Sequence, residues 1–409
     1  FLKIGAIVGL ALGIVFVAPQ MQMPAVTRFI DGTGPVWSGN LFPFLFITIA
    51  CGAVSGFHAL ISSGTTPKML ENESQARFIG YGGMLMESFV AAMAMVAACV
   101  IDPGVYFAMN SPAALIGTTP EQAAQVVSSW GFAVTPDVLV LTAKEVGGTT
   151  IISRAGGAPT LAVGMAHILH QVFGGEGMMA FWYHFAIMFE ALFILTAVDA
   201  GTRAGRFMLQ DLMGTFAPGL KRTDSLPANL IATGLCVAAW GYFLYQGVVD
   251  PLGGINTLWP LFGIANQMLA ACALTLGTVV LFRMKKDRYA WVTVMPTLWL
   301  LVCTLTAGWQ KLFDANPSVS FVANARRFAD AIAADKVLAP AKSVEQMQQI
   351  VFNNYLDAAL CGLFMLVVVA VMVFGVKAVL DARSKNRPSV RETPFEPMPA
   401  SALAAAGAE

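Results

Sequence analysis

The sequence predicts an all-α integral membrane protein that crosses the bilayer several times. Hydrophobic residues make up 57% of its 409 residues and charged residues only 12%, about half the charged share of a soluble domain. The mean hydropathy is +0.68. The apolar residues fall in runs of about 20, the length that a helix needs to cross the hydrocarbon layer. Most of the chain therefore belongs in lipid, and separate soluble domains are not expected.

Charge and cysteine content exclude several classes of function. The formal net charge is zero, and the basic residues form short clusters between apolar runs, which indicates membrane topology rather than a nucleic-acid surface. The six cysteines occur singly inside apolar runs, without the spacing of a disulfide, metal or haem site. We expect no cofactor, no bound metal and no nucleic-acid partner.

Eight segments are long and apolar enough to cross the membrane. They are residues 1–18, 41–63, 80–101, 178–200, 228–249, 256–282, 289–309 and 355–380. A ninth, at 160–173, is shorter and lies between Gly-rich breaks, so it is either a span or a re-entrant or outer hairpin. The first segment starts without an initiator Met or a signal-peptide pattern, and we expect a helix entered part-way, with more chain upstream.

Basic residues in short loops give the orientation, because they favour the cytoplasmic side. Two spans separate each basic cluster from the next, which puts all of them on one side. The clusters are Arg203, Arg206, Lys221 and Arg222; Arg283, Lys285, Lys286 and Arg288; and Lys377, Arg383, Lys385, Arg387 and Arg391. Lys68 and Arg77 join them only if 160–173 does not cross, which favours a hairpin there. Residues 102–159 and 310–354 then lie outside, although the second holds five basic residues, and the tail 381–409 lies inside.

The second segment, 41–63, is typical of an interrupted membrane helix. Its centre reads CGAVSGFH, where small and polar residues replace the expected leucines. Glycine weakens a helix by about 1 kcal/mol relative to Ala, and the polar side chains supply hydrogen bonds for freed backbone groups. The N-terminus of a half-helix would suit a carboxylate ligand. The alternative is close packing of a neighbouring helix on the glycines. The candidate substrate-binding residues are Gly52, Ser55, Gly56, His58, Ser62 and Ser63.

Carboxylates inside spans are candidates for proton or ion coupling, since burying a charge in the membrane is costly. Glu87 lies in GGMLMESFVA and is either a proton relay or a structural, hydrogen-bonded carboxyl. Residues 178–200 carry the most ionisable side chains of any span, and Glu190 is the stronger candidate among them. Asp199 is a coupling candidate too, but it can also pair with Arg203 four residues on.

Other polar residues in apolar segments have plainer interpretations. His167 and His170 share a helical face at a spacing that could suit a metal, but no acidic residue or cysteine nearby completes a site, so polar contacts or a pH-sensitive gate are favoured. Asn256, Asn266 and Gln267 need partners in lipid, and we expect them to bridge helices.

Long motifs along nearly the whole chain resemble the carbon starvation protein A family. They are GTGPVWSGNLFPFLFITIACGAVSGFHALISSGTTPKML, YGGMLMESFVA, SSWGF, IISRAGGAPTLAVGMA, FWYHFAI, LFILTAVDAGTRAGRFMLQD, KRTDSLPANL and VDPLGGINTLWPLFGIANQMLA. The resemblance implies an importer of peptides or of pyruvate with protons in the bacterial inner membrane, active in carbon starvation, and not an enzyme.

The resemblance also implies a specific fold. The family is grouped with the amino acid-polyamine-organocation transporters, whose core is two inverted five-helix repeats with a broken first helix in each. Residues 41–63 would be that helix in the second repeat, and the first repeat would lie upstream of residue 1. Residues 178–200 would be the eighth core helix, which implies that Thr196 could line a sodium site.

The leading hypothesis is therefore proton-coupled import by alternating access, with a small solute, a coupling ion and membrane lipid as partners. The alternatives are a proton-translocating subunit of a membrane enzyme complex and a nutrient sensor. The first would need a cofactor motif such as CxxC, CxxCH or GxGxxG, and the second a signalling domain after the last span; neither pattern occurs in the sequence.

Overall fold

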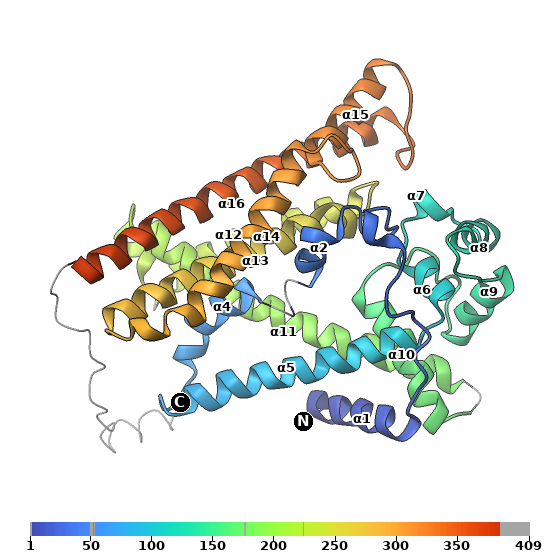
Figure 1. Ribbon diagram of the computed structural model, residues 1–409, viewed down its shortest axis with the longest axis horizontal. Helices are drawn as coiled ribbons and strands as arrows, with labels where there is room; N and C mark the ends of the chain where they lie inside the picture. The colour runs from blue at the N-terminus through green and yellow to red at the C-terminus, as the bar shows by residue number, and fades with distance from the viewer. Residues whose placement is uncertain (1, 50–51, 53, 176, 224, 385–409) are drawn as a thin grey trace.

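The computed structural model describes residues 2–49, 52, 54–175, 177–223 and 225–384, and within them every regular element is a helix (Figure 1). The α-helices are α1 (Leu2–Val17), α2 (Leu41–Thr48), α4 (Gly56–Gly64), α5 (Gln75–Val100), α6 (Pro103–Asn110), α7 (Ala113–Ile116), α8 (Pro120–Ser129), α9 (Pro136–Glu145), α10 (Gly157–Val172), α11 (Met178–Gly214), α12 (Leu226–Val249), α13 (Gly254–Arg283), α14 (Trp291–Phe313), α15 (Phe321–Ala333) and α16 (Val344–Ser384). Short 3₁₀ helices are η1 (Phe29–Asp31), η2 (Thr66–Lys68), η3 (Pro218–Lys221) and η4 (Asp287–Tyr289).

In the described part of the chain, six helices are long and apolar enough to cross a membrane. They are Gln75–Val100, Met178–Gly214, Leu226–Val249, Leu258–Arg283, Trp291–Phe313 and Val344–Ser384. The prediction of an all-α, multi-span membrane protein is thus confirmed at this level. Two expected spans differ: residues 1–18 give the 16-residue helix α1, and residues 41–63 divide into α2 and α4.

One layer of the molecule is built around α13. This helix packs along α16, α14, α12, α2 and α4. Glycines allow the closest approaches: a Cβ added at Gly375 of α16 would lie 2.3 Å from Thr275 Cγ2, and one added at Gly263 would lie 2.7 Å from the Ile47 carbonyl oxygen. Phe44 and Ile47 of α2 are buried among apolar side chains of α13, α14 and α16. The short helix α2 therefore buries one face in this layer, while Leu41, Phe42 and Leu45 on its other face are exposed.

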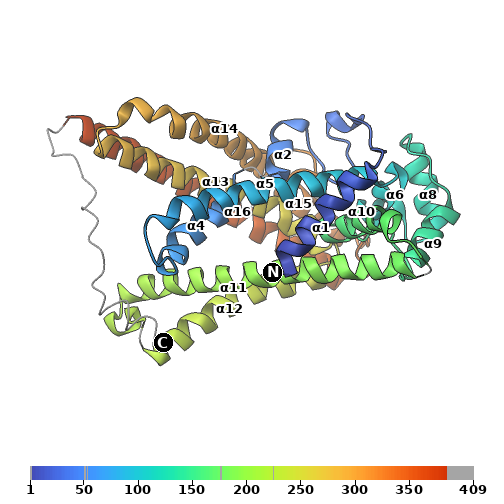
Figure 2. The same ribbon diagram turned by 90° about the horizontal axis from the view of Figure 1, so that it is seen from below.

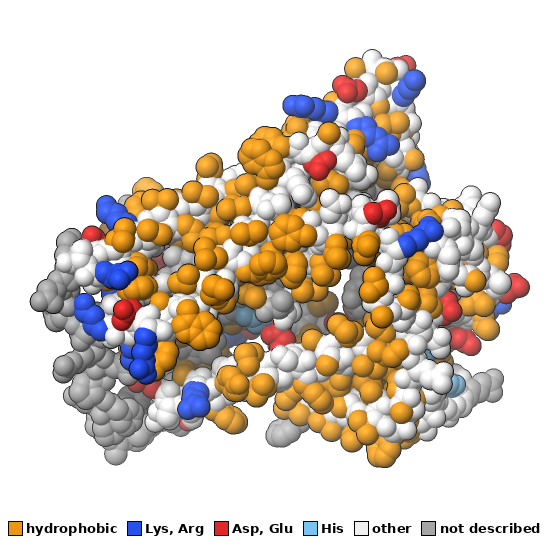
Figure 3. All heavy atoms as spheres, viewed as in Figure 1, with side chains coloured by type: hydrophobic (Ala, Val, Ile, Leu, Met, Phe, Trp, Pro, Cys, Tyr) orange, Lys and Arg blue, Asp and Glu red, His pale blue; other side chains and the backbone are white. Residues whose placement is uncertain are grey.

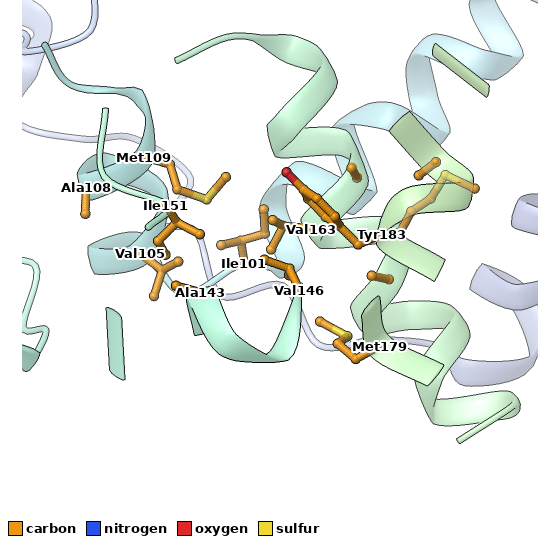
Figure 4. Packing of buried hydrophobic residues seen from close by; sticks show 14 of the residues in the cluster. Ile101, Val105, Ala108, Met109, Ala143, Val146, Ile151, Val163, Met179 and Tyr183 are labelled. Atoms are coloured by element: carbon orange, nitrogen blue, oxygen red, sulfur yellow. The ribbon is translucent and has the colours of Figure 1, made fainter. Parts of the chain in front are cut away.

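The second layer contains α1, α5, α10 and α11, with α6 to α9 at one end (Figures 1 and 2). A Cβ added at Gly164 of α10 would lie only 2.0 Å from the Ala97 carbonyl oxygen of α5, so these two backbones touch. Ile101, Val105 and Val163 belong to the core that joins the membrane helices to α6–α9 (Figure 4). Residues 102–159, expected as an outer segment, therefore carry helices that pack on the bundle.

The segment 160–173 requires a correction. It is not a hairpin but part of one uninterrupted helix, α10, which ends at Val172. The chain reverses only beyond Phe173, where α11 begins and packs along α10. The small residues Ala162 and Gly164 let α10 pack closely against its neighbours along its length. The end of α5 and the start of α11 lie at the same end of the molecule (Figure 1).

Two of the basic clusters that the sequence places on one side lie beside one another, those of residues 283–288 and 377–383. The turn between α13 and α14 lies beside the last turn of α16, and Lys285 Nζ donates to the Ala382 carbonyl oxygen at 3.4 Å. Lys and Arg side chains gather at this end, whereas hydrophobic side chains cover most of the broad face between the ends (Figure 3). Residues 385–409, most of the expected tail, lie outside the described residues.

Candidate functional site

The candidate site is the interruption between α2 and α4. Helix α2 ends at Thr48, and α4 begins at Gly56 after Ser55, whose φ of −101° and ψ of 116° are those of extended backbone. The Ser55 hydroxyl accepts a hydrogen bond from the His58 amide at 3.3 Å, which is an N-cap. Gly52 is exposed, and residues 50, 51 and 53 lie outside the described residues. A helix interruption in 41–63 is therefore present at the Gly-rich and Ser-rich centre.

Gly56 brings the start of α4 into direct contact with α13. A Cβ at this position would lie 2.2 Å from the Asn266 carbonyl oxygen and 2.6 Å from Leu269 Cβ. The next amide, Phe57 N–H, donates to Asn266 Oδ1 at 2.8 Å. Glycine is needed here because any side chain would push α4 and α13 apart. Gly56 therefore serves close helix packing and also lies at the helix interruption.

Asn266 and Gln267 of α13 bridge the two half-helices. Gln267 Nε2 donates to the Phe46 carbonyl oxygen of α2, while Asn266 Oδ1 accepts a hydrogen bond from the Phe57 amide of α4. Each side chain satisfies a backbone group that an unbroken helix would pair internally. The expectation that these residues bridge helices agrees with this geometry. Asn266 Nδ2 and Gln267 Oε1 are buried and find no hydrogen-bond partner in the described part of the chain.

An apolar cavity of about 340 Å³ lies beside the interruption. Phe57 and Leu60 of α4, Asn266 and Cys272 of α13, and Phe364 of α16 line it. Its volume is within the range of small-molecule sites, about 300–1,000 Å³. Asn266 supplies the polar group at its wall. Ser62 and Ser63 direct their hydroxyls to the Ala59 carbonyl oxygen, at 3.0 and 2.8 Å, and so bond within α4.

The four coupling candidates lie on α5 and α11, in the other layer. Glu87 is on an exposed stretch of α5, and Glu190 is half-buried on α11. Thr196 is exposed and its hydroxyl donates to the Phe193 carbonyl oxygen at 2.7 Å. Asp199 forms an ion pair with Arg203 at 3.1 Å. The contact between layers here is steric: a Cβ added at Gly201 of α11 would lie 3.0 Å from the Phe57 ring.

The two histidines of α10 face a second, more polar cavity. It has a volume of about 900 Å³ and is lined by His167 and His170 together with Lys144 and Glu145 from α9 and other residues. His170 Nδ1 is buried without a hydrogen-bond partner within the described residues. This cavity lies beside α6–α9, at the end where α5 finishes and α11 begins, and away from the helix interruption.

Three buried ionisable residues escaped the sequence analysis. Asp250 and Asp357 are 5% and 3% exposed, and they line one small cavity between α12 and α16. Lys311 is 5% exposed, and its ammonium group lies over the rings of Phe44 and Phe321, 5.2 and 5.4 Å from their centroids. All three stand at the ends of apolar segments, where a charge usually indicates a solvated boundary.

Comparison with known proteins gives consistent results. The family model described as carbon starvation protein CstA matches residues 1–307. Peptide transporter CstA of Escherichia coli (strain K12) is 69% identical over 405 residues, which are 98% of this chain and 58% of that protein. Pyruvate/proton symporter BtsT of the same organism is 57% identical over 422 residues, 98% of this chain and 59% of that protein.

More distant relatives agree. Peptide transporter CstA of Helicobacter pylori (strain J99 / ATCC 700824) is 52% identical over 402 residues, 97% of this chain and 58% of that protein. The chain thus spans somewhat over half the length of these relatives, which are named as transporters and not as enzymes. No solved structure matches this chain. From the family model and these identities we conclude that the chain belongs to the carbon starvation protein CstA family.

Proposed function

We propose that this chain is part of a secondary transporter of the bacterial inner membrane that imports a carboxylate-bearing solute, a peptide or pyruvate, together with protons. The observation that carries the proposal is the interrupted helix α2–α4, whose halves are bridged by Asn266 and Gln267. The printed names of the relatives, a peptide transporter and a pyruvate/proton symporter, support the two solute classes. Both classes share a carboxylate, and that is the group we assign to the site.

The solute carboxylate would lie at the start of α4. The positive end of the helix dipole favours an anion there, and Asn266 Nδ2 is a buried donor that lacks a partner among the described residues. The amides of Phe57 and His58 are already taken by Asn266 and Ser55. The amide of Asn266 is therefore the main donor that we add to the predicted set of Gly52, Ser55, Gly56, His58, Ser62 and Ser63.

In this proposal, the rest of the site is formed by the part of the full-length relatives that lies outside the segment this chain matches. An inverted-repeat transporter needs a second broken helix facing the first. Alternating access would then be a rocking of one bundle against the other around the α2–α4 interruption. We place the basic clusters and the C-terminal tail in the cytoplasm, and residues 102–159 and 310–354 in the periplasm. Glu87, Glu190, Thr196 and Asp199 remain coupling candidates.

Uptake measurements test the proposal directly. The full-length protein is expressed in starved cells that lack their own importers, and uptake of labelled pyruvate and of a labelled dipeptide is measured with and without a protonophore. We expect the cells to take up one of the two solutes, and we expect the protonophore to abolish that uptake. Uptake that persists with a sodium gradient would instead favour ion coupling at Thr196. No uptake of either solute would refute the transporter proposal and favour the sensor hypothesis.

A further inference from the structure

A polar cluster connects the end of α12 with α16, apart from the helix interruption. Asp250 directly follows α12, and its Oδ2 accepts a hydrogen bond from Asn353 Nδ2 at 2.7 Å, while its Oδ1 accepts from the Leu252 amide at 2.8 Å. Nearby, Gln349 Nε2 of α16 donates to Gln246 Oε1 of α12 at 3.4 Å. Burial raises the pKa of Asp250, and the hydrogen bonds from Asn353 and Leu252 oppose that effect. The cluster is therefore a built polar contact inside an apolar bundle.

Asp357 adds a second carboxyl to this cluster. It lies one turn after Asn353 on α16, is 3% exposed, and has no hydrogen-bond donor among the described residues. Asn353 is 7% exposed, and its Oδ1 is also buried without a partner in that part of the chain. If the Asn353 side-chain amide were flipped, its Oδ1 would face the Asp250 carboxylate and repel it. The hydrogen bond from Nδ2 to Asp250 therefore fixes the orientation of the amide.

Acceptors consequently outnumber donors at the cluster. Two carboxyl groups and one amide oxygen are buried together, and the Asn353 amide group and the Leu252 amide supply the hydrogen bonds. Leaving a buried acceptor unsatisfied costs about 1–3 kcal/mol. A proton bound to one carboxylate would turn an acceptor into a donor and would also remove one of the two like charges.

The space at the cluster limits what can bind. The cavity that Asp250, Asn353 and Asp357 line has a volume of about 10 Å³, which is about the room that one water molecule occupies. Its other walls are apolar or amide side chains, among them Leu258 and Leu356. An organic solute does not fit, whereas a proton needs no added volume.

The charged groups on the neighbouring elements do not neutralise the pair. On α14, the Lys311 ammonium lies over the Trp37, Phe44 and Phe321 rings. On α15, which packs along α16, Arg326, Arg327 and Asp330 are exposed. Helix α13 carries no acidic or basic side chain before Arg283 at its far end. On α16 the nearest ionisable groups are the exposed Tyr355 phenol and the buried Cys361 thiol. Tyr242 and Tyr245 of α12 are exposed.

From this geometry we propose that Asp357 and Asp250 form a proton-binding site, in which Asp357 holds the proton and donates to the oxygens of Asn353 or Asp250. Loss of the proton would place two buried carboxylates against each other and would weaken the contact between α12 and α16. Binding of the proton does not depend on the proposed function. Its role as the coupling proton does rest on that function, because coupling requires a transported solute.

Infrared spectroscopy tests the binding without requiring transport. The full-length protein in detergent is titrated with acid, and the carbonyl stretching band of a protonated, buried carboxyl group is recorded in pH difference spectra. We expect Asp357→Asn to remove this band. Asp250→Asn should shift its titration to lower pH, because a neighbouring negative charge is removed. Glu345→Gln is the matched control, since Glu345 is exposed in the first turn of the same helix.

Transport by the same proteins in liposomes tests the coupling role. We expect Asp357→Asn to lose accumulation driven by a pH gradient at least tenfold while solute exchange continues. A band unchanged in Asp357→Asn would overturn the proton site. If the wild-type protein shows no such band and its infrared spectrum changes instead when sodium is added at constant ionic strength, the site binds sodium and the proton assignment is overturned. An intact band in a wild-type protein that transports neither solute would refute the proposed function but not the proton site.

Discussion

The two layers of the molecule differ in how their polar groups are held. In the α5–α11 layer, Glu87 is exposed and Asp199 pairs with Arg203 at the surface. In the α13–α16 layer, Asn266, Gln267, Asp250 and Asp357 are at most 5% exposed and lie between helices. The environment of a polar residue in an apolar segment thus depends on which face of its helix it occupies. The α13–α16 layer thus buries amide and carboxyl groups of apolar segments, and burial of such groups costs free energy.

The largest effect is expected from substitution of Gly56. Gly56→Ala places a Cβ against the Asn266 carbonyl oxygen, and such overpacking costs about 1–3 kcal/mol. We expect a lower melting temperature and loss of uptake. Gly83→Ala in α5 is the matched control, because nothing lies within 4 Å of its added Cβ. There the better helix propensity of Ala should leave stability equal or higher. Equal behaviour of the two variants would contradict the distinction between the layers.

Two substitutions of Asn266 separate its structural and binding roles. Asn266→Leu removes the acceptor for the Phe57 amide and should destabilise the protein by about 1–3 kcal/mol. Asn266→Asp keeps an acceptor but loses the Nδ2 donor and adds a negative charge near the solute carboxylate. We expect it to raise KM by at least about tenfold, equivalent to about 1.4 kcal/mol, with a smaller loss of stability. Unchanged KM in Asn266→Asp would remove Asn266 from the binding site.

Substitutions of the α5–α11 carboxylates should affect coupling and leave solute exchange unchanged. If Glu190 relays protons, Glu190→Gln abolishes proton-driven accumulation and spares solute exchange, because Gln cannot carry the proton. We expect this for the half-buried Glu190 more than for Glu87, which is exposed. Accumulation and exchange are measured in the same liposomes. Wild-type accumulation in both variants would exclude both carboxyl groups from the coupling mechanism.

The smallest effect is expected at the Asp199–Arg203 pair. The two side chains are 60% and 54% exposed, and exposed pairs contribute about 0–1 kcal/mol. Asp199→Asn should therefore leave the melting temperature nearly unchanged. Any small difference in melting temperature from the wild-type protein should disappear at high salt. A large loss of accumulation without loss of stability would instead support a coupling role for Asp199.

The sequence predicted the parts of the site that depend on local pattern. Glycine and serine in an apolar segment pointed to the interruption in 41–63, and paired amides pointed to a helix contact at Asn266 and Gln267. The partners could not be predicted, because Phe57 and Asn266 are 209 residues apart in the chain, and Asp250 and Asn353 are 103 apart. The hairpin expected at 160–173 was wrong, since Gly-rich flanks mark the ends of α10 and not a turn within it.

The extended backbone at Ser55 has a mechanical consequence. In an unbroken helix, hydrogen bonds between successive turns make the rod stiff to twisting. At the start of α4 the amides of Phe57 and His58 bond to the side chains of Asn266 and Ser55 instead, so this end of α4 is attached to α13 by a side chain. Side-chain hydrogen bonds contribute about 1 kcal/mol each, which is within a few multiples of thermal energy. The interruption therefore divides the segment into two half-helices that are attached to α13 separately, α2 at Gly263 and α4 at Gly56.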